Sequence, residues 1–152
     1  MQDDPYAPPA SRLADPAHTA LPILYSRGGI ILATILGTLF TAGLLMYWNY
    51  CALESKPLGK RVFGAVVLIW IVSTSISLLL PEFPGDIFAL MFVDVVIISL
   101  VLDRTLRNSF ATFEGLGGVY YSLWRCAGIA LGISVLFLAF FFGLFRLWQV
   151  FS

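Results

Sequence analysis

The chain has 152 residues, of which 59% are hydrophobic and 12% are charged, and its formal net charge is zero. Soluble domains carry about 25% charged residues, so about half of the usual charge is missing here. The balanced charge argues against nucleic-acid binding and against a strongly basic membrane-surface protein, and the length leaves room for one membrane domain.

Residues 1–20 form a polar tail that contains Pro5, Pro8, Pro9 and Pro16 together with three aspartates. Such a segment buries too little apolar area to offset the entropy of ordering, so we expect it to be disordered. A polyproline II peptide that docks on a partner domain is the alternative for this tail.

Four apolar stretches follow, each about as long as a bilayer is thick. A helix rises about 1.5 Å per residue, so roughly 20 residues cross the hydrocarbon core. Backbone amides find no water there, which makes helices the favoured spanning structure. We therefore predict an all-α integral membrane bundle of four transmembrane helices over residues 21–152. The predicted spans are residues 30–50, 62–80, 87–102 and 126–148.

Two of the connections carry structural signals. The sequence PEFPGD between the second and third spans is a tight turn, so these two spans are expected to be antiparallel neighbours. Beyond Leu102, apolar residues continue at helical spacing through Leu106, Phe110 and Phe113. This spacing predicts that the third helix continues to about residue 114 as an amphipathic cytoplasmic extension.

Positive charges concentrate in the first and third connections, which predicts that residues 51–61 and 103–125 are cytoplasmic and that both termini lie outside. The membrane is expected to be crossed several times. The charges that set this orientation are Lys56, Lys60, Arg61, Arg104, Arg107 and Arg125. Contact with anionic lipid headgroups is the alternative role of Arg104, Arg107 and Arg125.

Asp94 lies within the third predicted span. A carboxylate near the bilayer centre costs about 2.5–3.5 kcal/mol on insertion scales, so it needs a compensating partner or protonation. We expect it to face the bundle interior, either as a structural bond between helices or as a site that binds a cation or relays a proton. Hydroxyl side chains at matching depth complete this candidate polar site: Ser73, Thr74, Ser77 and Thr38.

Small residues recur on one face of two spans, and such residues let membrane helices approach closely. The two stripes are expected to face one another within one molecule, and a dimer interface through one of them is the alternative. The stripe of the fourth span is Gly128, Gly132, Ala139 and Gly143, and that of the first span is Ala33, Gly37 and Thr41.

No motif indicates catalysis. The only histidine, His18, lies in the tail, and no serine or cysteine has a base nearby in a recognisable pattern. We therefore expect no enzyme, no cofactor and no metal site. Two functions remain: a non-catalytic subunit, accessory or interaction partner in the membrane, and a small oligomeric transporter or channel subunit that uses Asp94. The expected partners are the lipid bilayer and a membrane protein or a second copy of the chain.

Three segments resemble small uncharacterised bacterial membrane proteins with four spans. They are the run from Tyr25 to Pro57, the sequence GGVYYSLWR from Gly117 to Arg125, and the opening DPYAPP, where those proteins commonly have Asn-Pro-Tyr-Ala-Pro-Pro. The resemblance implies a bacterial inner-membrane location and a four-span plan, and it implies no activity. The glycines after Arg27 depart from that pattern.

Overall fold

The computed structural model describes residues 21–79 and 86–151, and this part of the chain is helical, with one isolated backbone bridge. The prediction of an all-α protein is therefore confirmed for the described residues. The predicted tail and the PEFPGD turn lie outside them. The helices are α1 (Arg27–Leu36), α2 (Leu39–Ala52), α3 (Lys56–Leu79), α4 (Asp86–Thr105), α5 (Arg107–Gly115) and α6 (Leu123–Phe151).

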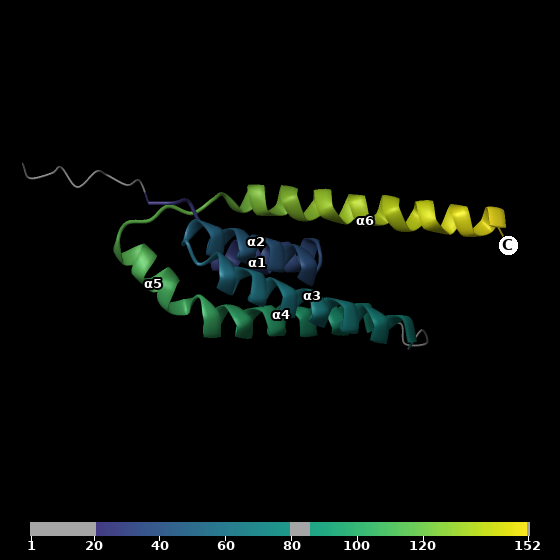
Figure 1. Ribbon diagram of the computed structural model, residues 1–152, viewed down its shortest axis with the longest axis horizontal. Helices are drawn as coiled ribbons and strands as arrows, with labels where there is room; N and C mark the ends of the chain where they lie inside the picture. The colour runs from purple at the N-terminus through teal and green to yellow at the C-terminus, as the bar shows by residue number, and fades with distance from the viewer. Residues whose placement is uncertain (1–20, 80–85, 152) are drawn as a thin grey trace, which may run out of the picture.

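Helices α1 and α2 lie side by side in the middle of the molecule, with α6 on one side and the α3–α4 pair on the other (Figure 1). Helix α2 packs mainly on α3, while α1 packs on α6 and α4. We call the end that holds α5 and the start of α6 the base end. The opposite end, where α6 finishes and where α3 and α4 flank residues 80–85, is the far end.

The first predicted span, residues 30–50, is not one helix. It is divided between α1 and α2, which have 10 and 14 residues and are therefore about 15 and 21 Å long. The break falls at Gly37 and Thr38. A Cβ atom on Gly37 would lie 2.8 Å from Thr41 Oγ1 and 2.9 Å from the carbonyl oxygen of Ala33, so only glycine fits this close approach. Thr38 then adopts an extended backbone and directly precedes α2 as its N-cap residue.

Asn49 holds the two ends of this helical hairpin together. Its side-chain oxygen accepts a hydrogen bond from the backbone N–H of Tyr25 at 2.7 Å, and its amide donates to the Tyr25 carbonyl at 2.8 Å. Asn49 is 1% exposed, so both bonds lie in the protein interior. The start of α1 and the end of α2 therefore meet at the base end, and the hairpin enters and leaves on one side.

The segment before α1 is fixed at the same end. Leu24 donates its backbone N–H to the carbonyl of Val119 at 3.4 Å and accepts a bond from Tyr121 at 2.8 Å. The chain thus enters α1 beside the α5–α6 connection, whereas α6 finishes at the far end (Figure 1). The prediction that the two ends of the chain lie on one side, opposite residues 103–125, does not fit this arrangement. The hairpin starts and finishes at the base end, so it does not carry the chain from one end of the described structure to the other.

The predicted helical extension beyond residue 102 has a break. Helix α4 ends at Thr105 and α5 begins at Arg107, with Leu106 between them at φ −119° and ψ −5°. Helical hydrogen bonds nevertheless run through the break, from Leu106 to Leu102 and from Phe110 to Leu106. Leu106, Phe110 and Phe113 are all buried, so the apolar face predicted from the sequence is the one that packs.

Two of the described helices are long and apolar enough to cross a membrane: Lys56–Ile76 in α3 and Leu123–Gln149 in α6. Helix α4 has 20 residues, but every stretch of 18 residues within it contains three charged residues. A four-span bundle is therefore not what the described structure establishes.

The predicted stripe of small residues on α6 does not face α1. Helix α6 contacts α1 through Cys126 and Ala130, and a Cβ atom on Gly29 of α1 would lie 2.6 Å from Cys126 Sγ. Gly128 and Gly132 have open space around them, because successive residues of a helix point about 100° apart and these two lie on the opposite side. Ala33 and Thr41 of the other stripe are fully buried. The residues of the α6 stripe, Gly128, Gly132, Ala139 and Gly143, are all exposed.

Candidate functional site

A cavity of about 340 Å³ lies where the tip of the α1–α2 hairpin meets α3 and α4. The hairpin contributes its turn, α3 contributes one aromatic and two hydroxyl side chains, and α4 contributes the carboxylate. Four of the five residues of the predicted polar site line this one cavity. The lining residues are Thr34, Ile35, Gly37, Thr38, Trp70, Ser73, Thr74, Leu90, Met91 and Asp94.

Asp94 is bonded to α3 across this cavity. Ser73 Oγ donates a hydrogen bond to Asp94 Oδ1 at 3.3 Å, and both side chains are partly buried. The two residues belong to neighbouring helices joined by the short connection at residues 80–85, which explains why a serine of α3 reaches α4 at this depth. The bond is long for an O–H donor, so it holds Asp94 weakly.

Thr38 brings an unpaired hydroxyl to the same cavity. Its Oγ1 atom is buried, and no described group forms a hydrogen bond with it. As the residue that precedes α2, Thr38 is in the position where a threonine hydroxyl commonly caps the helix, yet it makes no such bond. A buried hydroxyl without a partner costs about 1–3 kcal/mol, so Thr38 destabilises the hairpin tip slightly.

The C-terminal end of α1 also reaches the cavity. The last carbonyl groups of a helix have no partner within it and carry a partial negative charge. One of them is bonded across the fold, because Ser134 of α6 donates to the carbonyl of Leu36 at 3.3 Å. The N-terminal end of α2, which begins at Leu39 beside it, carries an opposite partial positive charge, so the carboxylate of Asp94 is the main source of negative charge in this region.

The other hydroxyls near Asp94, predicted or not, divide between the cavity and the helix backbone. Thr74 lines the cavity, whereas the neighbouring Ser75 donates to the carbonyl of Ile71 within its own helix. Thr34 lines the cavity but donates to the carbonyl of Ile30. The side chain of Ser77 lies outside the described part of the structure.

This set of ligands suits a proton or a small hard cation. Such cations prefer carboxylate, hydroxyl and carbonyl oxygens, which are the groups gathered at the hairpin tip. Within residues 21–79 and 86–151, no three His, Cys, Asp or Glu side chains come together in a way that could hold a metal ion.

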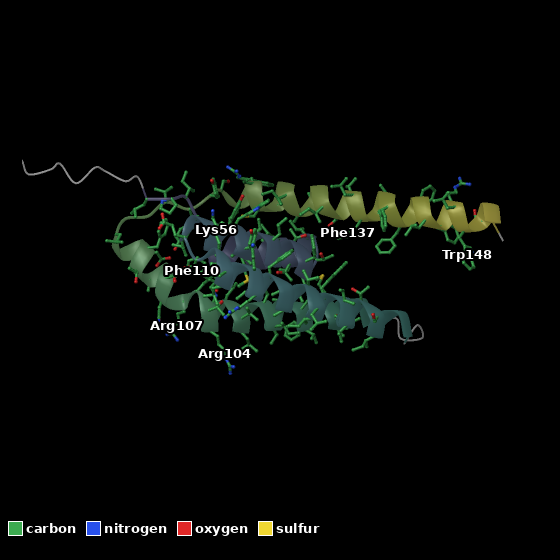
Figure 2. All side chains as sticks on the ribbon, viewed as in Figure 1. Lys56, Arg104, Arg107, Phe110, Phe137 and Trp148 are labelled. Carbon is green, nitrogen blue, oxygen red and sulfur yellow. The ribbon has the colours of Figure 1, made fainter. Side chains whose placement is uncertain are left out.

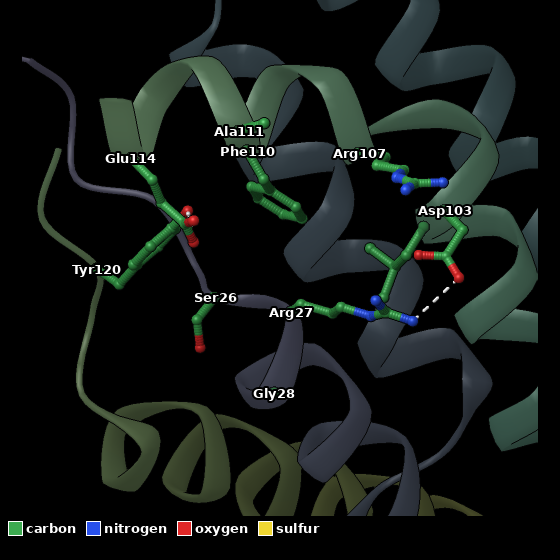
Figure 3. A pocket seen from close by; sticks show the side chains of 10 residues that line it. Ser26, Arg27, Gly28, Asp103, Arg107, Phe110, Ala111, Glu114 and Tyr120 are labelled. Atoms are coloured by element: carbon green, nitrogen blue, oxygen red, sulfur yellow. Dashed lines mark hydrogen bonds and ion pairs between the residues drawn. The ribbon is translucent and has the colours of Figure 1, made fainter. Parts of the chain in front are cut away.

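A second cavity, of about 430 Å³, opens at the base end between the start of α1, the end of α4 and α5 (Figure 3). Arg27 and Asp103 form an ion pair of 3.0 Å on one side of it. On the other side Tyr120 donates its hydroxyl to Glu114 at 3.1 Å. Burial and this bond to Glu114 raise the pKa of Tyr120 to about 12. Of the predicted charges in the connections, Arg107 lines this cavity and Arg104 does not.

Charged and aromatic side chains surround the base end more widely. Lys56, Arg104 and Arg107 gather there, whereas Trp148 lies near the far end of α6 (Figure 2). The guanidinium of Arg125 lies 3.9 Å from the ring centre of Tyr121. Lys60 and Arg61 are exposed in the first turns of α3.

Two important features are not evident from the residue types alone. Asn49 lies in the aromatic cluster YWNY and is indistinguishable there from a polar residue at the membrane surface. Its position in an otherwise apolar run is the signal that could have found it, because a buried amide needs partners. Glu114 and Tyr120 are six residues apart across a glycine-rich loop, and no periodic pattern links them.

Comparisons of the chain with models of known protein families, with curated proteins and with solved structures gave no match.

Proposed function

We propose that this chain is a multi-pass membrane protein of the bacterial inner membrane that binds a proton or a small monovalent cation at the hairpin-tip cavity, as a small oligomeric transporter or channel subunit. Helices α3, α4 and α6 cross the bilayer, and the α1–α2 hairpin enters it from one side without crossing. We propose no enzymatic reaction for this protein.

The exposed surface of α6 supports the membrane location. Only 6% of its most apolar stretch is buried within the protein, whereas the core helix of a soluble protein is mostly buried. Its outer half exposes a continuous series of large apolar side chains, which monomeric soluble proteins rarely do. The exposed set includes Leu138, Phe140, Phe141, Phe142, Phe145, Leu147 and Trp148.

The charges support an orientation with the base end in the cytoplasm. Positive residues near the ends of membrane helices favour the cytoplasmic side. In this arrangement the start of α1 is cytoplasmic as well, and the C-terminal end of α6 lies outside together with Arg146. The basic residues of the base end are Arg27, Lys56, Lys60, Arg61, Arg104, Arg107 and Arg125.

The observation that carries the proposal is the meeting of Asp94 with the turn between two half-length helices. Irregular backbone at membrane depth is tolerated where it lines a cavity, and many transporters place the ends of broken helices against their ion sites. Here Gly37, Thr38 and the end of α1 face the carboxylate across a cavity of about 340 Å³. A hairpin that served only for packing would not require an acid at its tip.

Ion flux into proteoliposomes that contain the purified full chain tests this function. We expect a pH gradient or a sodium gradient to drive flux, and Asp94→Asn to reduce it at least about tenfold, because the variant keeps the shape but loses the charge. Asp103→Asn is the matched control on the same helix, since Asp103 pairs with Arg27 at the surface. Flux that is absent from the wild type, or that survives Asp94→Asn, would refute the proposal.

A second function is favoured by the free surface of α6: a non-catalytic subunit or interaction partner in a membrane assembly. The stripe from Gly128 to Gly143 points away from the hairpin, and small residues are where membrane helices approach one another. Gly132→Leu would disrupt such an interface, because a large side chain would keep the two helices apart. Leu138→Ala would not, because Leu138 lies outside the stripe and the substitution adds no volume. The measurement is the oligomeric state, or the set of co-purified proteins, in mild detergent.

A further inference from the structure

The base-end cavity shown in Figure 3 has a charge pattern that the proposed ion site does not use. Four charged residues line it: Arg27, Asp103, Arg107 and Glu114. Arg27 and Asp103 neutralise each other at 3.0 Å, which leaves one guanidinium and one carboxylate. Among the described side chains, Arg107 has no carboxylate partner within ion-pair distance.

Arg107 and Glu114 are both on α5 and are seven residues apart, which is two helical turns. They therefore lie on one face of the helix, separated by about 10 Å along its axis. Phe110 and Ala111 line the wall between them, so the cavity has a positive end, an apolar middle and a negative end. A ligand with a phosphate and an ammonium group a few ångströms apart matches this pattern.

The negative end is held in place. Tyr120 donates its hydroxyl to Glu114 at 3.1 Å, and its ring packs 6.1 Å from the Phe110 ring centre. The hydroxyl of Tyr120 is protonated at physiological pH, as in any tyrosine, and it therefore remains a donor to Glu114. Glu114 keeps its other lone pairs for a hydrogen-bond donor in the cavity.

The position of the cavity relative to the proposed membrane indicates the source of such a ligand. The cavity lies at the base end beside the aromatic group of Tyr25, Trp48 and Tyr121. The ring centre of Tyr25 lies 5.9 Å from that of Trp48 and 4.7 Å from that of Tyr121. Aromatic side chains with a polar edge prefer the headgroup level of a membrane.

We propose that the base-end cavity binds the headgroup of a zwitterionic phospholipid that has a primary ammonium, with the phosphate on Arg107 and the ammonium on Glu114. Bidentate contact is available between a guanidinium and a phosphate, and an ammonium can donate an N–H to a carboxylate. The apolar wall at Phe110 and Leu102 then contacts the glycerol end of the lipid. This lipid site is separate from Asp94 and does not depend on ion passage there. It rests only on the proposed membrane location of the protein.

Native mass spectrometry of the purified full chain, titrated with phosphatidylethanolamine, phosphatidylcholine and phosphatidylglycerol, tests the proposal. We expect phosphatidylethanolamine to bind best and Arg107→Gln to weaken it about tenfold or more, because a charge-assisted contact is lost. Glu114→Gln removes the negative end and should shift the preference toward anionic phosphatidylglycerol. Arg104→Gln is the matched control, since Arg104 lies three residues away and does not line the cavity.

Three results would overturn the proposal. The first is wild-type binding of phosphatidylglycerol as tight as that of phosphatidylethanolamine. The second is equal binding of phosphatidylcholine, which has no N–H to donate to Glu114. The third concerns the source of the ligand: soluble phosphoethanolamine that displaces the lipid at equal concentration would show that the site takes a free metabolite instead of a membrane lipid.

Discussion

At the base end, large apolar side chains such as Leu24, Leu45 and Leu106 are fully buried by other parts of the same chain, whereas at the far end Phe141 and Trp148 keep 57% and 73% of their area exposed. The base end is also fastened by polar bonds, including those of Asn49 to Tyr25. The base end therefore has a core buried within the protein, although Trp124 at the start of α6 is 86% exposed, whereas every residue of α6 from 138 to 149 is exposed. In the proposed membrane protein, lipid covers the apolar side chains of the far end.

The largest expected effect tests that comparison through a charge on α6. Leu136 is 70% exposed and lies at the middle of the stretch Leu123–Gln149. In a bilayer, Leu136→Asp should cost about 3–4 kcal/mol of insertion free energy, because aspartate replaces leucine at the helix centre. The measurement is the fraction of molecules that insert, by a glycosylation or protease-protection assay.

The control for Leu136→Asp is Leu116→Asp. Leu116 is 64% exposed, but it follows α5 at the base end, where headgroups or water are expected. It should therefore change insertion by less than about 0.5 kcal/mol. Equal tolerance of both substitutions would mean that α6 is not surrounded by lipid.

The next effect concerns the bond that fastens the base end. Asn49→Ala removes both partners of the Tyr25 backbone groups and leaves them buried without hydrogen bonds, which should lower the free energy of unfolding by about 2–3 kcal/mol. Denaturation in detergent micelles measures this loss. Asn108→Ala removes an exposed amide from α5 and should have little effect; a loss as large as that of Asn49→Ala would show that the hydrogen bonds are not the cause.

A smaller effect is expected at the turn of the hairpin. Gly37→Ala places a methyl group 2.8 Å from Thr41 Oγ1 and 3.2 Å from Ala130 Cβ, so the hairpin tip must shift away from α6 at a cost of about 1–3 kcal/mol. Gly64→Ala in α3 has open space around it and should instead stabilise its helix by about 0.5–1 kcal/mol. Thermal unfolding of the two variants in the same detergent gives opposite signs if the turn is packed as described.

The smallest effect is expected for the ion pair of Arg27 and Asp103. Their side chains are 53% and 42% exposed, so solvent screens the attraction. Arg27→Gln should change the free energy of unfolding by about 0–1 kcal/mol, and the change should shrink further at high salt. A loss of several kcal/mol would show that the base end depends on this pair and not on Asn49.

The helical class and the two long helices could be predicted from the sequence, because long apolar runs allow little else. The contact of Asp94 with α3 also follows from the sequence, since a tight turn brings neighbouring helices together. The break at Gly37 and Thr38 could not be predicted in this way, because hydropathy averaged over 20 residues takes no account of a two-residue turn. The side on which Gly128 and Gly132 lie was equally hidden, because the inner and outer faces of a membrane helix are both apolar.

The hairpin has a consequence for the order in which the chain is assembled. Helix α1 packs mainly on α6, which is the last of the described helices to leave the ribosome. Until α6 has been made, Gly29 and Gly37 lack Cys126 and Ala130, which pack against them, so the hairpin cannot complete its packing while the preceding helices are being translated. Chains that stop before Leu123 should therefore be substrates for membrane quality-control proteases, even though they contain every residue that lines the hairpin-tip cavity.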